Sequence, residues 1–279
     1  VMGPTGVGKS KFINSYIGEE VTAVSDRMES CTKQISYHPQ VLPDTHPTCP
    51  GRRVVLIDTP GFDDTYSPPY ETLRMISVAL ASTYANDLRV GSVLYLNSVS
   101  QKRMFGSMRL DYQMFREICG SRASTQVTMA TTHWDSAELE SPGAGDSREG
   151  EFRTKFWKDI LDEGAVLERI EDYNSDPDRI IDEILRKAQE TEIRKRGLQI
   201  QEELVDKEKK LTDTEAGKKL RYTLEEIKEI LKQAPVQSME EQRQAMVNVQ
   251  EQLDNFETRW FDKLKGAFGR LKRGSVSRR

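Results

Sequence analysis

Eight residues close to the N-terminus constrain the fold of this chain more than any other feature. The segment Gly3-Pro4-Thr5-Gly6-Val7-Gly8-Lys9-Ser10 has Gly, four residues and then Gly-Lys-Ser, which is the phosphate-binding loop pattern. Its glycines let backbone N–H groups turn inward, and the helix expected over 9–17 directs its positive dipole end at the same place. We expect Lys9 to neutralise phosphate oxygens and Ser10 to ligate Mg²⁺. The simpler alternative is a glycine turn between a strand and a helix. The predicted nucleotide contacts here are Gly3, Thr5, Gly6, Val7, Gly8, Lys9, Ser10 and Lys11.

Short apolar runs alternate with amphipathic segments up to about residue 175. The expected strands are 53–57, 92–96, 126–130 and 165–170, and the expected helices are 9–17, 71–84, 108–118 and 152–161. This alternation is typical of an α/β fold with a parallel-rich sheet flanked by helices. Only Val1 and Met2 precede the phosphate-binding loop, so we expect the first strand of the domain to be truncated. Residues 136–150, rich in Ser, Gly, Pro and acidic residues, are expected to form an exposed loop.

A second motif supplies candidate metal ligands. The apolar strand ends in Asp58-Thr59-Pro60-Gly61, and a carboxylate at this place suits a water-mediated Mg²⁺ contact. Gly61 can present its backbone N–H to a γ-phosphate. Between the two motifs, a hydroxyl in the segment 30–34 could close on Mg²⁺ as nucleotide switches do; Thr32 is the better candidate and Ser30 the alternative. Without the upstream loop, Asp58 to Gly61 would indicate only a strand and a turn.

A third motif concerns the base. Thr131-Thr132-His133-Trp134-Asp135 follows an expected strand. Asp135 could accept from guanine N1–H and the 2-amino group together, a pair that adenine lacks. His133 and Trp134 could stack on the ring, and we include Thr132 in this site. A capping Asp is the alternative. Farther on, Asn174 and Ser175 could bring a backbone N–H to the guanine O6, or only cap a helix.

Composition changes near residue 176. From 176 to 233 about half the residues are charged, with the two signs nearly balanced, which favours long solvated helices. Leu220, Leu224, Ile227 and Leu231 have helical spacing, but Gly197 and Gly217 interrupt a long heptad register, so a coiled coil is only one option. A second helix is expected over 239–271. We therefore divide the chain into a G domain at 1–185 and a helical extension at 186–279.

Charge and cysteine content limit the partners. Residues 260–279 carry seven Lys/Arg and one acidic residue, which leaves 34 basic and 44 acidic residues elsewhere. An acidic body argues against nucleic acid as a partner. The basic tail has an apolar stripe, and it could contact an anionic membrane surface or pack on the preceding helices. No apolar run of spanning length is present. Three widely spaced cysteines favour a reducing compartment, so we expect an intracellular, cytoplasmic protein, for which a peripheral membrane contact through this tail is one option.

These motifs, in this order, resemble the G domain of the septin-like GTPase branch, which includes the immunity-associated nucleotide-binding proteins (GIMAP) and the chloroplast import receptors. The phrases GPTGVGKSKFIN, SCTKQIS, VVLIDTPGFDDT, VLYLNSVSQKRM and TTHWD carry the resemblance, which is strongest to uncharacterised fungal G-domain proteins. It covers about residues 1–185. The resemblance implies a Rossmann-like sheet, guanine nucleotide, Mg²⁺ and dimerisation through the nucleotide face. It also suggests that Arg103 reaches the partner's nucleotide across that dimer; a surface Arg is the alternative.

Three positions depart from the usual GTPase pattern. The base motif has His133 where Lys is usual, which weakens guanine selectivity while Asp135 favours it. Phe62 follows Gly61 where Ras-like enzymes place a water-orienting Gln, so intrinsic hydrolysis should be slow. Thr5 also stands where many small GTPases need glycine for an inserted arginine. Three functions follow: a slow GTPase acting as an assembly switch, a GTP-binding module without useful turnover, and an ATPase or small-molecule kinase, against which Asp135 argues.

Overall fold

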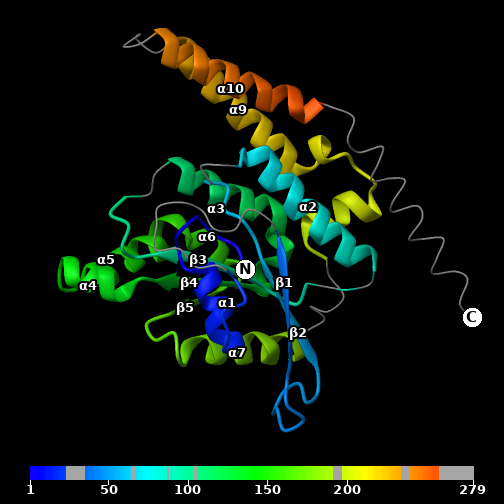
Figure 1. Cartoon of the computed structure of the whole chain (residues 1–279), viewed down its shortest axis with the longest axis vertical. Helices are drawn as coiled ribbons and strands as arrows, with labels where there is room; N and C mark the ends of the chain where they lie inside the picture. The colour runs from blue at the N-terminus through cyan, green and yellow to red at the C-terminus, as the bar shows by residue number, and fades with distance from the viewer. Residues whose placement is uncertain are drawn as a thin grey trace, which may run out of the picture.

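The computed structural model describes residues 1–22, 35–63, 67–86, 88, 90–103, 106–190, 197–233 and 239–257. A central sheet lies between two layers of helices, and two further helices pack together beyond one of these layers (Figure 1). The predicted α/β class is confirmed. The predicted Thr32, and the alternative Ser30, lie outside the described residues, as does the basic tail from residue 258 onward.

The parallel part of the sheet follows the predicted strands closely. Strands β3 (Val93–Ser98), β4 (Val127–Thr132) and β5 (Val166–Arg169) pair in parallel in that order. Met2 forms a parallel bridge to Tyr95, with its N–H donating to the Leu94 carbonyl at 2.8 Å. The chain therefore enters the phosphate-binding loop from the sheet, beside β3.

An antiparallel pair lies on the other side of the Met2 bridge. Strand β2 (Arg53–Asp58) pairs with β1 (Ser36–Val41), which the sequence analysis did not identify. Pro39 cannot donate to a ladder, and such a residue is tolerated in a strand at a sheet edge. Two histidines of this region have side-chain partners: His38 pairs with Ser36 at 2.7 Å, and His46 Nε2 lies 3.0 Å from Asp182.

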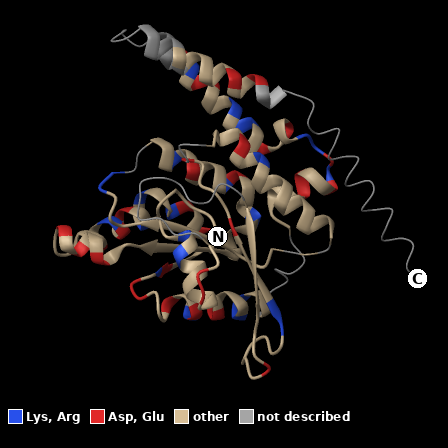
Figure 2. Cartoon of the chain, viewed as in Figure 1, with Lys and Arg blue, Asp and Glu red and all other residues tan. Residues whose placement is uncertain are grey.

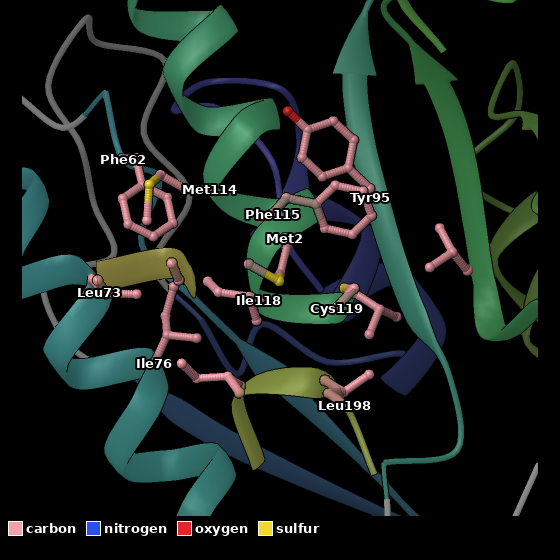
Figure 3. Close-up of a cluster of buried hydrophobic side chains, with 14 of the residues drawn as sticks. Met2, Phe62, Leu73, Ile76, Tyr95, Met114, Phe115, Ile118, Cys119 and Leu198 are labelled. Atoms are coloured by element: carbon pink, nitrogen blue, oxygen red, sulfur yellow. The ribbon is translucent and has the colours of Figure 1, made fainter. Parts of the chain in front are cut away.

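Both faces of the parallel sheet are buried. Side chains alternate along a strand, so Tyr95 and Met129 join one core cluster while Leu94 and Leu96 join another. Helices α1 (Lys9–Ile17) and α7 (Asp176–Glu190) cover the second face. The first face is covered by helices α2 (Pro69–Ala85), α3 (Gly106–Cys119) and α6 (Lys158–Asp162). A 3₁₀ segment, η1 (Ser121–Gln126), connects α3 to β4. Figure 3 shows the first cluster between α2, α3 and β3.

The expected loop at 136–150 is helical instead. Helices α4 (Trp134–Glu140) and α5 (Ala144–Glu151) cover this stretch, and Glu149 in α5 is buried. Arg169 Nε lies 3.0 Å from each carboxylate oxygen of Glu149, and the Thr131 hydroxyl donates to the same group at 3.0 Å. One of the acidic residues of this stretch, Glu149, is therefore an internal ion-pair partner that holds α5 against the sheet, while Glu138, Glu140 and Asp146 are exposed.

The helix predicted at 152–161 is divided. A π-helical turn, η2 (Phe152–Phe156), ends at Trp157, and α6 begins after it. Trp157 is fully buried and stacks on Phe152, with ring centroids 4.5 Å apart. The break between η2 and α6 therefore lies at Trp157, whose large ring is directed into the core.

The C-terminal segment packs on the same core as the sheet. After α7 come the short elements α8 (Gln199–Gln201), η4 (Glu202–Asp206) and η5 (Leu211–Asp213), then α9 (Glu215–Gln233) and α10 (Met239–Glu257). Leu198, Leu220 and Leu224 are buried in the cluster that holds Tyr95. The predicted division into two domains at residue 185 stays a proposal. One hydrophobic core includes residues from both sides of that boundary.

The expected charged helices are present, in separate pieces. Figure 2 shows both charge signs along α7 and α9, where Arg179–Glu168 and Arg221–Glu225 are among the ion pairs. Helices α9 and α10 pack side by side (Figure 1), and Leu220 faces the domain core. Among the described residues, no helix is both long and apolar enough to span a membrane.

Candidate functional site

The phosphate-binding loop has the backbone that its glycines predict. Gly6 has a φ of 78° and Gly8 a φ of 93°, a left-handed region that side-chain-bearing residues rarely adopt. Gly8 is followed directly by α1, whose first N–H groups have no intrahelical acceptors. Gly3 approaches β3 so closely that a Cβ there would lie 2.2 Å from the Leu96 carbonyl oxygen. The loop is thus fixed between β3 and α1.

Lys9 is buried at the base of this loop. Its Nζ donates to the carbonyl oxygens of Gly3 and Pro4, each at 2.7 Å, and the residue is only 6% exposed. These two hydrogen bonds hold the ammonium group against the loop backbone. Without them, the long side chain of Lys9 would sample many rotamers. A positive charge fixed at this place can compensate a bound phosphate.

The two predicted metal ligands meet. Ser10 Oγ donates to Asp58 Oδ2 at 2.9 Å, and Asp58 is fully buried at the end of β2. Mg²⁺ prefers oxygen ligands and usually keeps several waters, so it needs few protein groups beside substrate phosphates. Within the described part of the chain, no cluster of three His, Cys, Asp or Glu residues could hold a metal alone. A hydroxyl and a carboxylate beside a phosphate-binding loop fit Mg²⁺ of this kind.

The segment after Asp58 folds over the loop. A Cβ added to Gly61 would lie 2.9 Å from the Thr5 backbone nitrogen and 3.1 Å from the Gly3 carbonyl oxygen. Gly61 is therefore in close contact with the loop, as its predicted phosphate role requires. Phe62 points away, is 3% exposed and belongs to the core with Met114 (Figure 3). An aromatic ring buried in this way cannot orient a water.

Two carboxylates that the sequence analysis did not select hold this segment. Asp63 Oδ1 accepts from the Thr5 N–H at 2.7 Å, and Asp111 Oδ2 accepts from the Phe62 N–H at 2.8 Å. Tyr95 also donates to Asp111, at 3.0 Å. Burial and then the nearby Asp63 charge raise the pKa of Asp111 to about 6. No local motif marks Asp111, because it comes from the distant helix α3.

The base motif is attached to the phosphate-binding loop. The Thr132 hydroxyl lies 2.9 Å from the Val7 carbonyl oxygen and 3.0 Å from His133 Nδ1. Thr132 is fully buried, so it connects the end of β4 to the loop and is not itself open to a base. His133 has a φ of 60°, a strained conformation of the kind that clusters at functional sites.

An aromatic side chain completes this part of the site. A Cβ added to Gly8 would lie 2.5 Å from the Tyr173 hydroxyl and 4.0 Å from His133 Cε1. Lys11 Nζ lies 4.1 Å from the Tyr173 ring centroid. Burial and then the Lys11 charge lower the pKa of His133, while burial raises the pKa of Tyr173 to about 12. These contacts bring His133, Tyr173 and Lys11 together beside Gly8. Tyr173 was not predicted as a site residue, although it directly precedes the predicted Asn174, and that neighbouring position could have identified it.

Asp135 and Trp134 have different surroundings. Asp135 is exposed in the first turn of α4, where a ligand can reach its carboxylate. The Trp134 ring is covered by the Arg169 guanidinium, 4.1 Å from the ring centroid, and a Cβ on Gly145 would lie 2.8 Å from it. Our expectation that Trp134 stacks on a base is therefore wrong, because this ring already packs on Arg169 and Gly145.

Asn174 and Ser175 are used within their own turn. The Asn174 N–H donates to Asp172 Oδ1 at 2.9 Å, the Ser175 hydroxyl donates to Oδ2 at 3.1 Å, and the Ser175 N–H donates to the Asp172 carbonyl oxygen at 3.3 Å. The Asn174 backbone N–H lowers the pKa of Asp172, with Ser175 adding to the effect. The predicted contact to guanine O6 is therefore not supported: both N–H groups have acceptors in the turn that starts α7.

Arg103 lies apart from this cluster. It is exposed in the segment after β3, beside Lys102, which pairs with Glu140 at 2.9 Å. Nothing among the described contacts directs its guanidinium to the phosphate-binding loop, so its role in trans stays a prediction.

Comparison with known proteins supports the phosphate-site assignment. Residues 1–107 match the family described as 50S ribosome-binding GTPase. This match includes the phosphate-binding loop, Asp58 and Gly61. Over these residues the chain is similar to a P-loop GTPase family. The match covers less than half of the chain and ends before the base motif. No curated protein matches the chain significantly.

Solved structures resemble this G domain. Toc33 from Arabidopsis thaliana in complex with Mg²⁺ and GMPPNP is 18% identical, with a TM-score of 0.51, over 68% of this chain and 83% of that chain. Toc33 from Arabidopsis thaliana in complex with GDP and Mg²⁺ is also 18% identical, with a TM-score of 0.44, over 69% of this chain and 81% of that chain. At this identity the likeness to the complex with Mg²⁺ and GMPPNP shows the fold alone, which is the G-domain fold predicted above.

Proposed function

We propose that this chain binds guanine nucleotide with Mg²⁺ and hydrolyses GTP slowly, as a nucleotide-controlled assembly switch. One observation carries the proposal: two motifs far apart in sequence meet at the phosphate-binding loop through three contacts. Asp58 accepts from Ser10, Gly61 lies so near the loop that an added Cβ would meet the Thr5 nitrogen, and Thr132 donates to the Val7 carbonyl. A turn that merely joined a strand to a helix would not need all three. The Toc33 neighbour was solved with Mg²⁺ and a GTP analogue, which agrees with this proposal.

The residues have separate roles in it. Lys9 supplies fixed positive charge to the phosphates, and the loop N–H groups and the start of α1 add further donors. Ser10 and Asp58 hold Mg²⁺, which when bound neutralises phosphate charge. His133 and Tyr173 lie beside the base, and Asp135 selects guanine by accepting from two N–H groups. A partner's Arg103 completes the site if the nucleotide faces of two copies meet.

Slow turnover rests on Phe62. The residue that follows Gly61 is the one that orients water in faster enzymes, and here its ring is buried in the core. The same burial favours the second candidate, a GTP-binding module with no useful turnover. An ATPase is disfavoured by the exposed carboxylate of Asp135, which matches guanine and not adenine.

Nucleotide affinity and single-turnover hydrolysis test the proposal together. We expect the full chain to bind GDP and a GTP analogue more tightly than ATP, and to turn over bound GTP slowly. Lys9→Ala should reduce affinity about a hundredfold or more, since a buried charge partner of phosphate is removed. Lys155→Ala, which removes an exposed lysine paired within its own helical turn, should change nothing. Tight binding with no single-turnover product would select the binding module; preference for ATP would overturn guanine specificity.

The assembly role has its own test. Hydrolysis per molecule should rise with protein concentration in the wild type and lose that dependence in Arg103→Ala. A neighbouring exposed cation, Lys102, provides the control: Lys102→Ala breaks its pair with Glu140 and should keep the dependence. If the hydrolysis rate is independent of concentration in all three proteins, the proposal that dimerisation controls the switch is wrong.

A further inference from the structure

The phosphate-binding loop is closed by a carboxylate of its own chain. Asp63 Oδ1 accepts a hydrogen bond from the Thr5 backbone N–H at 2.7 Å. Thr5 lies in the middle of the loop, between Gly3 and Gly6. Backbone N–H groups of such loops bind anions, and here one of them already has an anionic acceptor.

The position of this carboxylate is defined by Gly61. A Cβ on Gly61 would lie 2.6 Å from Asp63 Oδ1 and 2.9 Å from the Thr5 nitrogen. These atoms therefore converge on the spot where the Gly61 N–H is expected to meet the outermost phosphate of a nucleoside triphosphate. A carboxylate and a phosphate are both anionic acceptors, so the two compete for the same donor and repel each other at this distance. A diphosphate has no third phosphate and avoids the competition.

The carboxylate is also held in place. Phe62, its neighbour, is buried and donates its N–H to Asp111 at 2.8 Å. Asp111 lies on α3, and Tyr95 from β3 donates to its other oxygen at 3.0 Å. Displacing Asp63 from Thr5 therefore works against a backbone anchored one residue away, in contrast to a carboxylate on an unattached loop.

We propose that Asp63 determines phosphate-number specificity: by occupying the Thr5 N–H it favours nucleoside diphosphate and weakens triphosphate until it is displaced. This inference rests on the proposed function, since it deepens the role of the same site. Asp63 thus has an effect opposite to that of the loop residues around it, because removal of its carboxylate strengthens the binding of triphosphate. Triphosphate binding then requires residues 61–63 to move, which couples the third phosphate to the conformation of these three residues.

Affinities of two variants test the inference. With Mg²⁺ present, the dissociation constants of GDP and of the non-hydrolysable analogue GMPPNP are measured by calorimetry for wild type, Asp63→Ala and Asp63→Asn. A hydrogen bond to a charged group is worth about ten- to a hundredfold in an equilibrium constant. We expect Asp63→Ala to bind GMPPNP about tenfold or more tightly, with GDP affinity changed less than about twofold. Asp63→Asn keeps the shape and loses the charge, so it should shift GMPPNP in the same direction by less.

Asp64→Ala is the matched control, since it removes an identical charge one residue further along the chain. It should leave the ratio of the two affinities at the wild-type value. An equal shift of that ratio in both variants would mean that net charge alone acts, and would overturn the inference. Weaker GMPPNP binding in Asp63→Ala would also overturn it, because Asp63 would then support the triphosphate.

Amide hydrogen exchange gives a readout that does not depend on triphosphate. In the GDP complex the Thr5 N–H should be protected in the wild type and exchange faster in Asp63→Ala, while the Phe12 N–H, bonded to the Gly8 carbonyl within α1, should be unchanged. Unaltered Thr5 protection would contradict the contact. If the wild type binds GDP but Asp63→Ala leaves the affinity ratio unchanged, only this inference fails; if the wild type binds neither nucleotide, the proposed function fails first and this inference with it.

Discussion

Ser10 Oγ donates to Asp58 Oδ2 at 2.9 Å, although 48 residues separate them. This contact joins the start of α1 to the end of β2 and places the two oxygen groups proposed as Mg²⁺ ligands side by side, one of them on a fully buried residue. If both hold Mg²⁺, metal binding depends on the relative position of the loop and the strand.

Removal of the Ser10 hydroxyl should reduce the effect of Mg²⁺ on nucleotide affinity. Ser10→Ala leaves Asp58 with one donor fewer, and we expect triphosphate affinity to fall about tenfold or more with Mg²⁺ and much less without it. Titrations of GMPPNP with and without Mg²⁺ measure this difference. Ser147→Ala, an exposed serine in α5, is the control. Equal losses in the presence and absence of Mg²⁺ would contradict the ligand role.

Base selectivity should depend on Asp135. Asp135→Asn replaces an acceptor by a group that also donates, so GTP affinity should fall about a hundredfold while xanthosine triphosphate affinity rises. Competition binding with the two nucleotides gives the measurement. Glu138→Gln removes another exposed carboxylate of α4 and should not change either affinity. Unchanged selectivity in Asp135→Asn would shift base recognition to His133 and Tyr173.

The sequence predicts most of the parallel sheet and the phosphate half of the site. Strands β3, β4 and β5 are apolar runs bounded by turns, and each lies within one or two residues of its predicted range. Ser10 and Asp58 were predicted as Mg²⁺ ligands because Ser10 completes the phosphate-binding loop pattern and Asp58 ends an apolar strand. Local pattern is sufficient when a buried strand ends in a polar residue.

The remaining features depend on tertiary contacts that no local pattern encodes. Helix α5 was expected to be a loop from its Ser, Gly, Pro and acidic content, because the sequence does not show that Glu149 pairs with Arg169, twenty residues away. Strand β1 contains Pro39 and is formed only because β2 offers it a partner. Asp63 and Asp111 act on the backbone of Thr5 and Phe62, and backbone contacts leave no residue-type signal at the receiving position.

Asp111 should make stability depend on pH. Its pKa, raised to about 6 by burial and then by the Asp63 charge, exceeds the ordinary value of 3.8. The folded protein therefore binds this proton more tightly than the unfolded chain, and the resulting stabilisation is complete below about pH 4 and lost as pH rises through about 6. The difference in pKa corresponds to about 3 kcal/mol.

Asp111→Asn tests this dependence. The amide keeps an acceptor for the Phe62 N–H and cannot ionise, so the difference in unfolding free energy between variant and wild type should move in favour of the variant by about 2–3 kcal/mol from pH 4 to pH 7.5. Thermal or urea unfolding at several pH values measures it. Asp159→Asn, at an exposed position of α6, gives the baseline. A constant difference across this range would mean that Asp111 titrates at its ordinary value.

Gly217 should be required for attachment of the C-terminal helices. A Cβ at this position would lie 1.9 Å from the Leu211 carbonyl oxygen and 3.1 Å from Thr212 Cα, and backbone atoms cannot move aside as a flexible side chain can. Leu220 and Leu224, farther along α9, are buried in the core that also holds Tyr95 and Phe62. Gly217→Ala should therefore lower the unfolding free energy by about 3 kcal/mol, as overpacking of a filled site does. Urea denaturation measures the loss.

Gly150→Ala is the matched control, because a Cβ there meets no atom within 4 Å and the alanine should stabilise α5 by up to about 1 kcal/mol. GDP affinity should be unchanged in the folded fraction of both variants, since α9 contributes none of the proposed nucleotide contacts. Equal stability of the two alanine variants would show that η5 and α9 can separate freely, and the C-terminal segment would then be an independent unit, as the division at residue 185 proposes.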